Sequence, residues 1–135
     1  MKAIRILVVD DESVVRDGVV TILSFQPDMK VVGEAENGLK AVEIARQTKP
    51  DVVLLDMVMP KQNGLESIPK IKAVSPDSRI LVLTSFAESD RVYQSIKAGA
   101  LGFLLKDATR VQLLQAIRDV SKGLASIQPS IAMKV

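Results

Sequence analysis

The sequence contains no cysteine and no histidine. The lack of cysteine excludes disulfides, thiolate metal sites and cysteine nucleophiles, and it fits a reducing compartment, so we expect a cytoplasmic location. The lack of histidine removes the commonest general base and the usual zinc ligand, and it excludes a phosphohistidine within this chain. Any proton or phosphoryl transfer must therefore use carboxylates, lysine, hydroxyl groups or water.

Aromatic residues are also few, the net charge is small and the apolar runs are short. Aromatics make up 3% of the 135 residues, so a core must be built from aliphatic side chains. The net charge is +2 and the basic residues are scattered, without the basic stripe that is typical of nucleic-acid binding. The apolar runs are far shorter than the roughly 18 residues that cross a membrane. We therefore expect a single globular domain that does not enter a membrane.

Short apolar runs alternate with segments of helical periodicity along the whole chain. This pattern predicts strands at 4–9, 30–35, 51–55, 79–83 and 101–105, and helices at 13–25, 38–48, 65–74, 88–98 and 109–122. Four of the strand runs are nearly continuous Val, Ile and Leu, as in strands covered on both faces. The alternation favours an α/β fold in three layers, a (βα)5 sandwich around a parallel sheet.

Local signals mark several of the helix ends. Thr109 and Gln112 form a predicted capping box at the start of the fifth helix, and Gly123 is placed to end it. The fourth helix is the weakest, with Val92 and Ile96 as its expected apolar anchors. Pro69 falls within the third helix, which leaves the start of that helix uncertain.

Polar residues directly follow four of the five strands. Asp10 and Asp11 follow IRILVV, Asp56 follows DVVLL, Thr84 follows RILVL and Lys106 follows LGFLL. The carboxyl ends of parallel strands lie at one edge of the sheet, where ligands bind in folds of this class. Each residue alone has an ordinary explanation, such as a helix cap, a turn residue or a solvated lysine. Their shared location predicts a common site.

The chemistry of these residues suits a divalent cation and a phosphoryl group. Clustered carboxylates without nitrogen or sulfur ligands favour Mg²⁺ or Mn²⁺. A carboxylate can also attack phosphorus and form an acyl phosphate. We assign Asp56 as the nucleophile and Asp10 and Asp11 as metal ligands. Lys106 and Thr84 would then contact the phosphoryl oxygens.

Four segments carry a family resemblance: VVDDE (8–12), LLDMVMPKQNG (54–64), LTS (83–85) and GFLLKD (102–107). In this order and spacing they resemble the receiver domain of bacterial two-component response regulators. The segment VVGEAENGLKAVE (31–43) and the C-terminal tail resemble the LuxR/NarL-type subfamily, in which the receiver precedes a DNA-binding domain. The resemblance covers about residues 3–122.

This resemblance implies a flavodoxin-like sheet of order 2-1-3-4-5 and a specific set of roles. A sensor histidine kinase would donate a phosphoryl group to Asp56. Asp11, Asp56 and the backbone carbonyl of Val58 would bind Mg²⁺, with Asp10 assisting directly or through water. Thr84 and the aromatic side chain of Phe103 would act as the switch pair.

We therefore interpret residues 1–122 as a receiver domain and 123–135 as the start of an interdomain linker. The predicted function is a phosphorylation-activated signalling switch and not a turnover enzyme. We expect this switch to form a homodimer on phosphorylation. DNA would be bound only by a C-terminal domain outside this chain. One alternative is a metal-dependent phosphohydrolase, although Asp56-Met57-Val58 lacks the second acid of a D-x-D motif. The other is an interaction module that works without phosphate.

Overall fold

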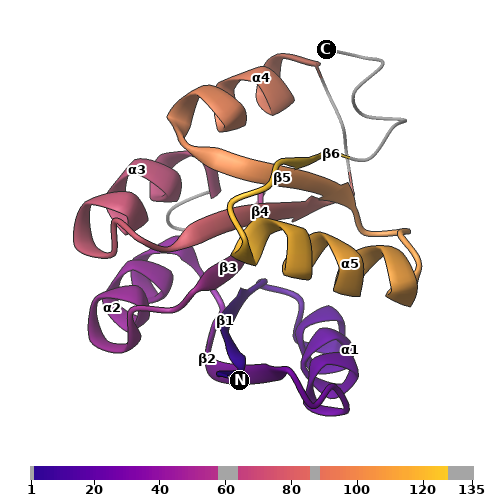
Figure 1. Cartoon of the computed structure of the whole chain (residues 1–135). Helices are drawn as coiled ribbons and strands as arrows, with labels where there is room; N and C mark the ends of the chain where they lie inside the picture. Colours follow the sequence, from indigo (N-terminus) through magenta and orange to yellow (C-terminus); the bar gives the residue numbers. More distant parts are fainter. Residues whose placement is uncertain (1, 58–63, 86–88, 128–135) are drawn as a thin grey trace.

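The computed structural model describes residues 2–57, 64–85 and 89–127, and its framework is a parallel sheet covered by helices on both faces (Figure 1). The order of the strands in the sheet is β2-β1-β3-β4-β5-β6. Their bounds are β1 (Ile4–Val9), β2 (Met29–Ala35), β3 (Val52–Asp56), β4 (Arg79–Thr84), β5 (Ala100–Leu105) and β6 (Ser126–Ile127). The predicted flavodoxin-like order 2-1-3-4-5 is confirmed.

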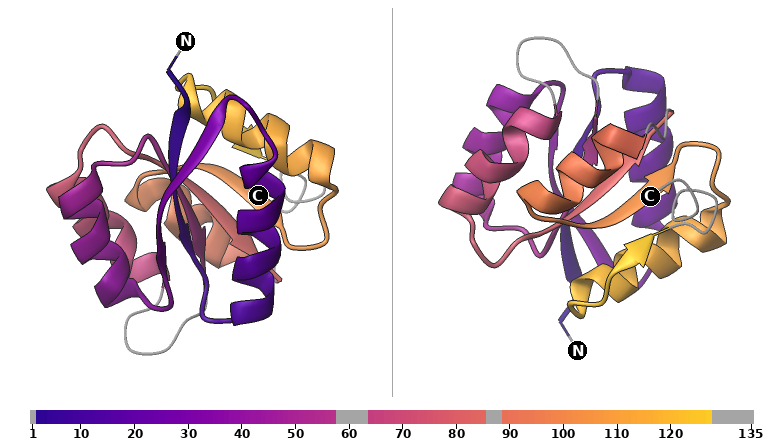
Figure 2. Two further views of the ribbon diagram at one scale, coloured as in Figure 1. Left: turned by 90° about the horizontal axis from the view of Figure 1, so that it is seen from below. Right: turned by 90° about the horizontal axis from the view of Figure 1, so that it is seen from above.

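Two helices cover one face of the sheet and three cover the other (Figures 1 and 2). α1 (Ser13–Ser24) and α5 (Arg110–Ser121) share one face, and α2 (Gly38–Thr48), α3 (Gly64–Val74) and α4 (Ser89–Ala98) share the opposite face. Aliphatic side chains fill both layers, including Val19, Leu23 and Ile117 on the first face and Ala41, Ile68 and Ile71 on the second. Among the described residues, no helix has the length and apolar character needed to cross a membrane.

The helix ends follow the local chemistry of the sequence. The Thr109–Gln112 capping box is present at the start of α5. Gly123 lies just beyond the end of α5 with a φ of +83°, a conformation that glycine adopts without a Cβ penalty. Asn37 caps α2 by accepting a hydrogen bond from the backbone N–H of Lys40 at 2.9 Å. Pro69 lies inside α3, which begins at Gly64.

Two features differ from the predictions. Ile96 is not a buried anchor of α4, because it is 38% exposed, while Val92 and Ser95 are fully buried. Among the α4 side chains that the structure describes, the fully buried ones are thus an aliphatic and a small polar side chain, with Ala98 packed against the same core, a combination that an apolar-periodicity pattern misses. In addition, Ser126 and Ile127, within the predicted linker, form the short strand β6 in parallel with Gly102 and Phe103 of β5.

A candidate phosphoacceptor and metal site at the carboxyl edge of the sheet

The sheet register brings the predicted polar residues to one edge. Val9 of β1 is paired with Leu55 of β3, so Asp10 and Asp56 follow at the same level. Thr84 is the last residue of β4 and is paired with Leu105, which directly precedes Lys106. The backbone N–H of Lys106 continues this ladder by donating to the carbonyl of Thr84 at 2.7 Å. The four strand ends therefore meet as the sequence predicted.

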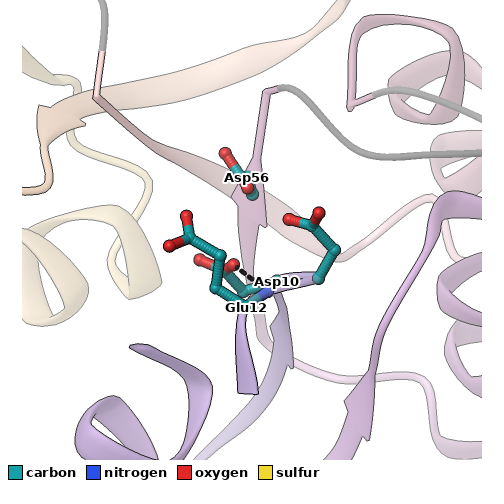
Figure 3. A group of neighbouring side chains, drawn as sticks. Asp10, Glu12 and Asp56 are labelled. Carbon is teal, nitrogen blue, oxygen red and sulfur yellow. Dashed lines mark hydrogen bonds between the residues drawn. The ribbon is translucent and has the colours of Figure 1, made fainter. Parts of the chain in front are cut away.

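The acidic residues form a compact cluster (Figure 3). Asp10, Asp11, Glu12 and Asp56 each offer a carboxylate oxygen, and these oxygens lie within 4.8 Å of one another. Asp10 and Asp56 are buried, at 3% and 4% exposure, whereas Asp11 and Glu12 are exposed. One oxygen of Asp10 accepts a hydrogen bond from the backbone N–H of Glu12 at 2.8 Å, which holds the turn after β1 (Figure 3). Such a cluster can hold a divalent cation.

Lys106 lies against this cluster and partly neutralises it. Its Nζ is 3.1 Å from Asp10, 3.3 Å from Asp56 and 3.0 Å from Glu12. Burial lowers the pKa of this ammonium, but its hydrogen bonds to Glu12 and Asp10 and the negative charge of Asp56 together hold that pKa above the ordinary lysine value. Lys106 is therefore a permanent cation beside the Asp56 carboxylate.

The two predicted switch residues are both inside the protein. Thr84 is 1% exposed and Phe103 is fully buried, in the apolar layer on the α2–α4 face of the sheet. The backbone carbonyl of Val58, the remaining predicted metal ligand, lies outside the described residues.

Two contributions were not foreseen from the sequence. Glu12, the last residue of the acidic run 10–12, binds Lys106 directly, although the sequence pattern predicted no role for it. Arg16 donates from Nη1 to the backbone carbonyl of Asp10 at 2.6 Å. The position of Arg16, one helical turn after the acidic run, is the sequence signal that could have indicated this contact.

Gly64 sits in close contact with the end of β3. Its N–H donates to the carbonyl of Met57 at 2.9 Å. A Cβ at this position would collide with the backbone carbonyl of Asp56 and lie 2.9 Å from the Cα of Met57. Glycine thus allows the start of α3 to pack directly on the strand end that carries the candidate nucleophile.

A surface depression lies next to the site on its β5 side. A depression of about 350 Å³ beside Lys106 is lined by Ser85, Leu105, Lys106 and Asp107. An arrangement of this kind, with a buried carboxylate beside a fixed ammonium at an open edge, can bind an anionic group against Asp56.

The comparison with known families agrees with this geometry. The model of the response regulator receiver domain matches residues 6–118. The chain belongs to this family. Among the most similar relatives of this receiver are the transcriptional regulatory protein LiaR of Bacillus subtilis, 42% identical, and the response regulator VraR of Staphylococcus aureus, 36% identical. Each alignment covers 98% of this chain and 63% of the relative, so the receiver spans less than two thirds of their length.

Solved structures support the same assignment. The signal receiver domain of NarL from Mycobacterium tuberculosis superposes with a TM-score of 0.87 at 38% identity, covering 91% of this chain and 99% of that domain. A LuxR-family response regulator from Aurantimonas gives a TM-score of 0.93 at 32% identity, covering 98% of this chain and 95% of that one. The predicted LuxR/NarL-type relationship is thereby confirmed.

Proposed function

We propose that this receiver is a switch that accepts a phosphoryl group on Asp56 from a phosphohistidine of a sensor histidine kinase. The observation that carries the proposal is the buried Asp56 carboxylate with the Lys106 ammonium 3.3 Å away. An oxygen of Asp56 attacks phosphorus, and the bond between phosphorus and the donor nitrogen breaks as the new O–P bond forms. Lys106 then exchanges part of its carboxylate contacts for the phosphoryl oxygens.

The acidic cluster fits Mg²⁺ as the cofactor, because it offers only carboxylate oxygens. Asp11 and Asp56 are the proposed ligands, with Asp10 assisting and the backbone carbonyl of Val58 completing the set. When bound, the cation would offset the negative charge that a phosphoryl group adds to the site. Asp10, Asp11 and Asp56 would hold the cation, and Lys106 and the hydroxyl of Thr84 would bind the phosphoryl oxygens.

The output of the switch is proposed to lie outside this receiver. LiaR is a transcriptional regulatory protein that is longer than the matched region. We propose by analogy that residues 1–122 are the switch, that 123–135 begin a linker, and that a C-terminal domain binds DNA in the cytoplasm. Movement of Thr84 toward the phosphoryl group would be coupled to Phe103 on the adjacent strand and would promote homodimerisation.

Treatment with acetyl phosphate tests the function without the cognate kinase. In the presence of Mg²⁺ the wild-type receiver should gain one phosphoryl group, measured by mass spectrometry of the intact protein. Excess EDTA should prevent this labelling. Asp56→Asn should gain none, whereas Asp77→Asn, which removes an exposed carboxylate from the loop before β4, should be labelled like the wild type. Full labelling of Asp56→Asn would refute the proposal.

A further inference from the structure

Arg16 ties together three segments at the edge of the acidic cluster. It lies in the first turn of α1, and its side chain is only 18% exposed. Nη1 donates to the backbone carbonyl of Asp10 at 2.6 Å, at the end of β1. Nε lies 3.4 Å from the carboxylate of Glu34 in β2. One guanidinium therefore holds the turn after β1 against both its helix and the neighbouring strand.

The bond to Asp10 acts on the peptide group that links Asp10 to Asp11. This peptide orients the backbone from which the Asp11 side chain projects. Mg²⁺ requires nearly ideal octahedral geometry at about 2.0–2.1 Å, so a small rotation of this peptide would displace a ligand. Nη1 bonds this peptide carbonyl while Nε lies against Glu34, so the planar guanidinium links the peptide to β2, which an ammonium with one contact does not do.

Charge alone would disfavour an arginine at this place. A permanent positive charge near a cation site repels the cation, and the partial compensation comes from Glu34, whose side chain is 45% exposed. The contact of Arg16 with the Asp10 carbonyl therefore positions the backbone, although the charge of Arg16 disfavours binding of a cation.

We propose that Arg16 is a positioning residue for the metal-binding turn and that, through the Asp10 carbonyl, it aligns Asp11 for Mg²⁺. Glu34 orients the guanidinium of Arg16 and offsets its charge. The inference rests on the proposed function, because it concerns the cation bound by the same carboxylates. Loss of an outer partner of a metal ligand lowers metal affinity by about 10- to 100-fold. Arg16→Ala should show a loss of this size.

Isothermal titration of the receiver with MgCl₂ tests this inference independently of phosphorylation. Arg16→Ala should bind Mg²⁺ about 10- to 100-fold more weakly than the wild type. Arg16→Lys should be intermediate, because an ammonium can reach one acceptor without the fork. Arg46→Ala, which breaks an exposed 3.6 Å pair with Glu43 on α2, should leave the affinity unchanged.

Whether the Mg²⁺ affinity of Arg16→Ala falls or rises separates a positioning role of Arg16 from a purely electrostatic one. If Arg16 acted only as a charge, its removal would tighten Mg²⁺ binding, and that result would overturn the inference. Unchanged affinity together with lower stability would assign Arg16 a structural role and would also overturn it. If Arg16→Ala does not fold, Arg16→Lys is compared with the wild type instead. Equal Mg²⁺ affinities of these two proteins would then overturn the inference. A wild-type receiver that binds no Mg²⁺ would instead refute the proposed function.

Discussion

Lys106→Met removes the ammonium that lies between the buried carboxylates of Asp10 and Asp56, at 3.1 Å and 3.3 Å. Methionine keeps most of the length of the side chain and deletes the charge, so the two carboxylates lose the cation that they share. Removing one partner of a fully buried ion pair costs about 3–5 kcal/mol. Because the Lys106 side chain is 14% exposed and its third partner, Glu12, is exposed, we expect a loss of about 2–3 kcal/mol without metal.

Mg²⁺ should reduce this difference. The cation and Lys106 neutralise the same carboxylates, so the variant should bind Mg²⁺ more tightly than the wild type and gain more stability from it. The raised pKa keeps the wild-type lysine charged, and its contribution is fully present below pH 10.5, the ordinary lysine value. It is lost only as the pH rises through the higher folded pKa, so the comparison can be made at any neutral pH.

Urea unfolding followed by circular dichroism, in EDTA and in saturating MgCl₂, measures both effects. Lys30→Met is the matched control, because Lys30 is exposed on the edge strand β2 and its replacement should change stability by less than about 0.5 kcal/mol. Equal stability of Lys106→Met and the wild type in EDTA would refute the electrostatic reasoning. A difference in stability between Lys106→Met and the wild type that Mg²⁺ leaves unchanged would refute the competition between Lys106 and the cation.

Three further substitutions test the packing near the site and the cap of α5 by urea unfolding. Phe103→Ala should lower the free energy of unfolding by about 3–5 kcal/mol, because Phe103 is fully buried; a loss below 1 kcal/mol would contradict its core position. Gly64→Ala should cost about 1–3 kcal/mol and slow labelling of Asp56, since its Cβ meets the end of β3; wild-type behaviour would argue against that contact. Thr109→Ala should cost about 1 kcal/mol through loss of the capping box, and an unchanged midpoint would count against the cap.

The strands, and the meeting of the candidate site residues at one edge of the sheet, were predictable because their signals are local. The apolar run before Asp56 marks β3, and the observed strand, Val52–Asp56, differs from the prediction by one residue at each end. The convergence of Asp10, Asp56, Thr84 and Lys106 follows from the parallel sheet. The strand order came from the family resemblance, because hydrophobic periodicity carries no information on which strands are neighbours.

The missed features depend on contacts between distant segments. β6 has only two residues and exists through pairing with Gly102 and Phe103, so its sequence carries little strand signal. The burial of Ser95 and the exposure of Ile96 follow from how α4 packs on the rest of the protein. Arg16 and Glu34 meet only because β1 and β2 are adjacent. Tertiary structure, not local propensity, determines all three.

The location of the phosphoryl group tests the central claim most directly. The receiver can be treated with acetyl phosphate and Mg²⁺, reduced with borohydride to trap an acyl phosphate, and mapped by peptide mass spectrometry. We predict a single reduced site, at Asp56. A modification at another residue would contradict the account, as would rapid turnover of acetyl phosphate without a protein-bound phosphoryl group.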